Sequence, residues 1–211
     1  MEKSQSIKAK ETLALGKGLN LLFWGGIFIA VDFIINDFDI LPDLIGYLFA
    51  IAGVLYLING SVLLETTGKV FTWIAAITVF LSFVAYIIEF LIKNLTHPLW
   101  IVFVSILFPI FLLSIAYVGY SISKKLVQNM EKRWRNLLFI YIVISLILFA
   151  IPVAFTVALP EILKDGTSFQ SSVNLHPMLF IILVFILPLI LVVYSFFTIR
   201  KTSKQLKNSV K

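Results

Sequence analysis

The sequence predicts an all-α membrane protein with six spanning helices. Of its 211 residues, 60% are hydrophobic and 13% are charged, whereas soluble domains are about half apolar and about a quarter charged. The hydrophobic residues gather in six runs, each close to the roughly 20 residues that a spanning helix needs. Of the 17 lysines and arginines, only Lys93 and Lys164 fall in the odd-numbered connections between these runs. We therefore expect one membrane domain over 1–211.

The predicted helices cover 13–35, 44–64, 70–92, 99–122, 137–159 and 178–199. The first run is too long for the apolar core of a signal peptide, and no small-residue cleavage site follows it, so we expect it to be retained. Pro42 suits the start of the second helix because it has no backbone N–H to leave unpaired there. Asp43 is expected to be its N-cap, since a carboxylate can accept from a free backbone amide.

The fourth and sixth predicted helices share a histidine-proline pattern. His97-Pro98 opens the fourth predicted helix and His176-Pro177 opens the sixth, and Pro109 and Pro188 lie eleven residues beyond the first proline of each. The pattern is compatible with three helical hairpins whose returning helices begin with proline and are weakened near the middle. Independent use of proline at helix starts is the alternative.

Charge placement predicts the orientation in the membrane. By the positive-inside rule, both termini and the basic loops lie in the cytoplasm, and the acidic turn after the first helix faces outward. This placement does not suggest a nucleic-acid surface. The basic segments 123–136 and 200–211 are expected to contact anionic lipid, with docking of a membrane or cytosolic protein as the alternative. A composition rich in Ile, Phe and Lys favours a bacterial plasma membrane over an endoplasmic-reticulum membrane.

Glycines predict how the first two helices pack. They recur every seven residues, close to two helical turns, at Gly18 and Gly25 in the first helix and at Gly46, Gly53 and Gly60 in the second. Small residues let membrane helices approach closely. In an antiparallel pair, we expect Gly25 opposite Gly53, Gly18 opposite Gly60 and Asp32 opposite Gly46. The same register places Asn20 level with Asn59.

The acidic turn NDFDILPDLIGY, residues 36–47, is open to two interpretations: a capped structural turn, which we favour, or a cation or substrate site. Together with GLNLLFWGGIFIAVDF it resembles an uncharacterised group of multi-pass membrane proteins of Firmicutes that carry an Asp-hydrophobic-Leu-Pro-Asp-x-Ile-Gly-Tyr turn after the first helix. The resemblance covers Gly18–Tyr47. It implies the fold and the membrane location and brings no activity with it.

Motifs of common enzymes are missing from the sequence, including H-E-x-x-H, G-x-S-x-G, the P-loop and the Rossmann glycines. The predicted membrane centre also lacks ionisable residues, which argues against a buried proton relay. We expect a non-enzymatic protein, a small permease-like or transport-associated subunit. A membrane accessory or immunity-type protein that binds a partner protein is the second hypothesis, and a metal-dependent membrane enzyme is the third.

Four polar residues at the outer helix ends form the candidate ligand site: Asp32, Glu89, His97 and His176. Mixed carboxylate and imidazole ligands suit a transition metal such as zinc, whereas carboxylates alone suit calcium or magnesium. The competing interpretation is structural. Each histidine then merely precedes a helix-opening proline, and Glu89 pairs with Lys93 one turn later. The sequence identifies no cofactor, and it has no cysteine for a thiolate metal site.

Overall fold

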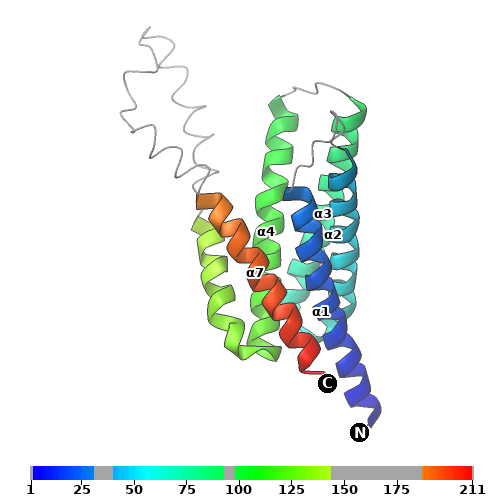
Figure 1. The fold of residues 1–211 in the computed structure, drawn as a ribbon, viewed down its shortest axis with the longest axis vertical. Coiled ribbons are helices and arrows are strands. Elements are labelled where there is room, and N and C mark those ends of the chain that lie inside the picture. The colour runs from blue at the N-terminus through cyan, green and yellow to red at the C-terminus, as the bar shows by residue number, and fades with distance from the viewer. Residues whose placement is uncertain (1, 31–39, 93–97, 144–186, 211) are drawn as a thin grey trace, which may run out of the picture.

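The computed structural model describes residues 2–30, 40–92, 98–143 and 187–210, and within these ranges it contains helices and short turns but no strand. This confirms the all-α prediction. The helices are α1 (Glu2–Ala30), α2 (Ile40–Gly60), α3 (Thr66–Leu91), α4 (Pro98–Leu126), a helix over 131–143 and α7 (Leu187–Asn208), with 3-10 turns η1 (Ser61–Leu63) and η2 (Gln128–Met130). They run alternately up and down one bundle, and both chain ends lie at the same end of it (Figure 1).

Three helical stretches of the described residues are long and apolar enough to cross a membrane: Gln5–Ile29, Asp43–Leu63 and Thr66–Glu89. The first helix begins at Glu2 rather than at residue 13 as predicted. Most of the additional residues 2–12 are Lys, Glu, Gln or Ala, which are good helix formers. The predicted N-cap was also misplaced, because Asp43 lies in the first turn of α2 and not before it.

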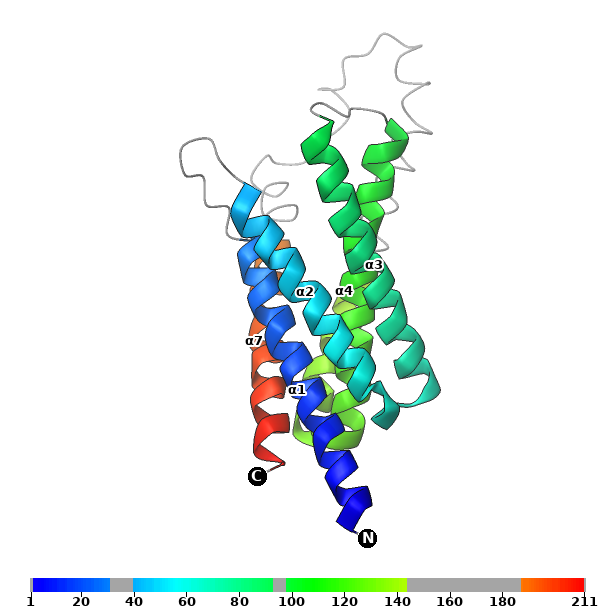
Figure 2. The ribbon, with the colours of Figure 1, turned by 90° about the vertical axis from the view of Figure 1, so that its right-hand side faces the viewer.

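α1 and α2 form a close antiparallel pair in which their glycines lie at the contact (Figure 2). The predicted register is wrong by seven residues. A Cβ added to Gly18 would lie 2.7 Å from the backbone oxygen of Gly53, and one added to Gly25 would lie 2.7 Å from that of Gly46. Gly60 instead packs against Leu15. Asn20 and Asn59 are therefore not level with each other, and Asp32 lies outside the described residues.

The bundle buries small polar side chains and exposes large apolar ones. Small hydroxyl side chains are buried, and most bond a carbonyl four residues earlier, as Thr72 does to Gly68 and Thr202 does to Thr198. Large apolar side chains are exposed, for example Trp73 on α3 and Phe197 on α7. Such a surface is costly in water and favourable in lipid, whereas buried small polar residues let membrane helices pack closely.

α3 and α4 form a second antiparallel pair, and α7 packs along α1 (Figure 2). The helix over 131–143 lies beside both α4 and α7, because Trp134 covers Gly119 of α4 and bonds Thr202 of α7. Pro109 lies inside α4 as predicted, and Pro188 lies in the first turn of α7. The histidine-proline pairs at 97–98 and 176–177 cannot be compared, since His97 and residues 176–177 fall outside the described ranges.

Candidate ligand-binding cavity

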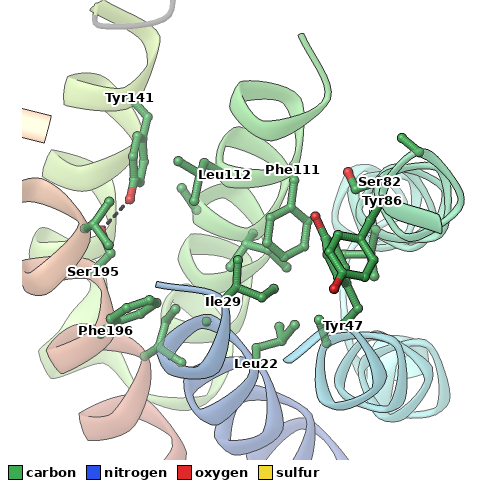
Figure 3. Close-up of a pocket in the computed structure, with 18 of the residues that line it drawn as sticks. Leu22, Ile29, Tyr47, Ser82, Tyr86, Phe111, Leu112, Tyr141, Ser195 and Phe196 are labelled. Atoms are coloured by element: carbon green, nitrogen blue, oxygen red, sulfur yellow. Dashed lines mark hydrogen bonds between the residues drawn. The ribbon is translucent and has the colours of Figure 1, made fainter. Parts of the chain in front are cut away.

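The six helical segments surround a cavity of about 480 Å³ in the middle of the bundle (Figure 3). Its walls are mainly apolar. Each segment supplies side chains to it, with Ile29 from α1, Ala50 from α2, Ala85 from α3 and Phe111 from α4 among them. A volume between about 300 and 1,000 Å³ with few polar groups is typical of small-molecule sites.

Trp134, near the start of the helix over 131–143, lines this cavity. Its side chain is 1% exposed, and its indole Nε1 donates to Thr202 Oγ1 at 2.9 Å. The ring fits only because residue 119 is glycine, since a Cβ there would lie 2.4 Å from two ring carbons. Although Trp134 lies within the basic segment 123–136, the structure buries it inside the bundle.

One side of the cavity carries a buried hydroxyl pair, Tyr141 from the helix over 131–143 and Ser195 from α7 (Figure 3). Ser195 Oγ donates to the carbonyl of Leu191 at 2.6 Å. Because the serine proton is used there, the Tyr141 hydroxyl is the donor of the tyrosine–serine bond. Both groups are thus satisfied within the protein and do not need a ligand.

The opposite side of the cavity holds further polar groups from α2 and α3, namely Tyr47, Ser82, Tyr86 and Glu89. Tyr47 and Tyr86 face the cavity with ring centroids 5.4 Å apart, and Tyr47 also contacts Phe83 at 6.0 Å (Figure 3). Glu89 lines the cavity one turn after Tyr86 and is exposed. Its Oε1 accepts a hydrogen bond of 3.0 Å from Trp100 Nε1 at the start of α4. Glu89 is therefore the acidic residue among the described residues that line the cavity.

Of the four residues predicted as a ligand site, the structure describes Glu89 alone and places it in the cavity. Asp32, His97 and His176 lie outside the described residues, as does Lys93, so the metal pocket and the Glu89–Lys93 ion pair stay predictions. Within 2–30, 40–92, 98–143 and 187–210, no three histidine or acidic side chains are grouped as metal ligands.

Sequence reasoning missed the two side-chain hydrogen bonds between the helix over 131–143 and α7. Trp134 and Tyr141 are seven residues apart, and so are their partners Thr202 and Ser195. A seven-residue spacing on both helices, read antiparallel, is the signal that would have found them. It is the same signal that the glycines of α1 and α2 carry.

Comparison with protein-family models, with curated proteins and with solved structures gave no match.

Proposed function

We propose that this chain is a six-span plasma-membrane protein, with both termini in the cytoplasm, that binds a mainly apolar small molecule in its central cavity. A small permease or a transport-associated subunit has this organisation. The observation that carries the proposal is the cavity itself, because an apolar space of about 480 Å³ enclosed by all six helical segments is suited to hold a molecule of moderate size.

The six-span topology draws support from the outward apolar surface and from the position of the termini. Three of the helices already have the length and composition of spans. Basic residues lie in the first turn of α3 (Lys69), in the last turn of α4 (Lys124) and in the first turn of the helix over 131–143 (Arg133). Figure 1 shows these helix ends at the end of the bundle that holds both termini. The positive-inside rule assigns that end to the cytoplasm, where the same residues can contact anionic lipid.

Native mass spectrometry of the protein purified in mild detergent tests the binding role. Ala85 is 2% exposed and lines the cavity, so Ala85→Phe should fill part of it and expel a retained small molecule. Ile77→Phe is the matched control, because Ile77 lies on the same helix but is 56% exposed on the outer surface. We expect the wild type and Ile77→Phe to retain the molecule and Ala85→Phe to lose it.

Two results would contradict this function. If all three proteins carry the same small molecules in equal amount, the cavity is not the binding site. If none carries a small molecule and one membrane protein co-purifies instead, the chain acts by binding a partner protein, which is the alternative function.

A further inference from the structure

Building on the proposed function, we infer that the preferred ligand of the cavity is a lipophilic organic cation, held with its charged group between Glu89 and the rings of Tyr47 and Tyr86. This inference rests on the cavity being a binding site. It adds the charge and the orientation of the ligand.

The described wall of the cavity contains an acidic side chain and no basic one. Among the lining residues that the structure describes, Glu89 is the one acidic side chain, and no lysine, arginine or histidine is present. Among these described residues, an organic anion would meet the Glu89 carboxylate and no basic side chain. A cation with apolar substituents would instead satisfy both the carboxylate and the apolar walls.

Glu89 also occupies an unfavourable position for an acid. It lies in the last turn of α3, and this turn contains no basic residue. Unpaired carbonyl groups give the C-terminus of a helix a partial negative charge. The Trp100 hydrogen bond supplies one donor and no charge. A carboxylate placed there costs stability, and a bound cation would recover it.

The aromatic residues beside Glu89 fit the same ligand. The rings of Tyr47, Phe83 and Tyr86 are grouped within 5.4 to 6.0 Å, measured from Tyr47. The faces of aromatic rings attract cations within about 6 Å, and quaternary ammonium groups are commonly held in this way.

A matched pair of fluorescent ligands separates charge from shape. (1-Naphthylmethyl)trimethylammonium and its uncharged carbon isostere 1-neopentylnaphthalene have nearly the same size. Binding of each to the full-length protein in lipid nanodiscs is measured by fluorescence, with the signal from Ala85→Phe nanodiscs subtracted as lipid background. We expect the wild type to prefer the cation about tenfold, which corresponds to about 1.4 kcal/mol.

Substitutions of Glu89 and Tyr47 should change the preference for the cation according to which group, the carboxylate or the ring, is removed. Glu89→Gln keeps an oxygen that can accept from Trp100 but removes the charge, so the cation should lose about tenfold in affinity and the isostere should be unaffected. Tyr47→Phe keeps the ring and should retain the preference, whereas Tyr47→Leu should reduce it severalfold.

Two binding results would overturn the inference. Equal binding of the two ligands, unchanged in Glu89→Gln, overturns the cation inference and leaves the apolar binding function intact; an internal ion pair between Glu89 and Lys93 would give this result. No binding of either ligand above the Ala85→Phe background contradicts the proposed function and the inference with it.

Discussion

Replacement of Gly25 by alanine tests the helix contact on which the bundle is built. The added Cβ would lie 2.7 Å from the backbone oxygen of Gly46 and 2.9 Å from the backbone nitrogen of Ala50, whereas ordinary contacts begin near 3.4 Å. Neither backbone atom can rotate away, so α1 and α2 must separate by several tenths of an ångström. Overpacking of this kind costs about 1–3 kcal/mol. The better helix propensity of alanine offsets about 0.5–1 kcal/mol of it.

The matched control is Gly16→Ala in the same helix. There the nearest atoms to a new Cβ are 3.4 to 3.5 Å away, so the gain in helix propensity remains without a clash. We expect Gly25→Ala to lower the free energy of unfolding by about 1–2 kcal/mol and Gly16→Ala to leave it unchanged or raise it by up to about 1 kcal/mol. Reversible unfolding by SDS in mixed micelles measures both.

Disulfide cross-linking checks the register directly, because the chain has no cysteine of its own. Cysteines at positions 25 and 46 should cross-link readily. Cysteines at 25 and 53 should not, since seven residues displace a position by about 10 Å along a helix, beyond the reach of a disulfide. Efficient 25–53 cross-linking, or equal stability of Gly25→Ala and Gly16→Ala, would refute the packing described here.

Three further tests probe other parts of the molecule. Gly119→Ala should lower the free energy of unfolding by about 1–3 kcal/mol in the same SDS titration, because its Cβ would lie 2.4 Å from the indole ring packed on it; wild-type stability would contradict that contact. Tyr141→Phe should lower the free energy of unfolding by about 0.5–1.5 kcal/mol, because the Ser195 hydroxyl keeps its carbonyl partner. Ser195→Ala should lower it by about 1–3 kcal/mol, because the buried Tyr141 hydroxyl is left unpaired. A larger loss in Tyr141→Phe than in Ser195→Ala would contradict the assignment of Tyr141 as the donor. An impermeant thiol reagent should label Gly166→Cys in intact cells and Asn129→Cys only after permeabilisation, and the opposite pattern would invert the proposed topology.

Sequence reasoning named Glu89 as a candidate site residue, and the structure places it on the cavity wall. Its predicted companions were Asp32, His97 and His176, chosen because they share a depth at the helix ends. The structure adds Tyr47, Tyr86 and Trp100 around it, which come from three helices. Tyrosine and tryptophan are common at membrane interfaces, so they gave no signal in the sequence until the helices were placed next to one another.

By itself, the sequence determined the all-α fold class, because long apolar runs with satisfied backbones in lipid can only be helices or closed barrels, and the lengths of these runs suit helices. It also determined that the glycines of α1 and α2 lie at a shared contact. Tertiary structure decided the register, since a seven-residue spacing matches itself when shifted by seven. Pairing Gly18 with Gly53 and Gly25 with Gly46 centres the hairpin on the connection between Ala30 and Ile40, whereas the predicted pairing displaces that centre towards α2. The connection, and not the glycine pattern, therefore selects one of two equivalent alignments.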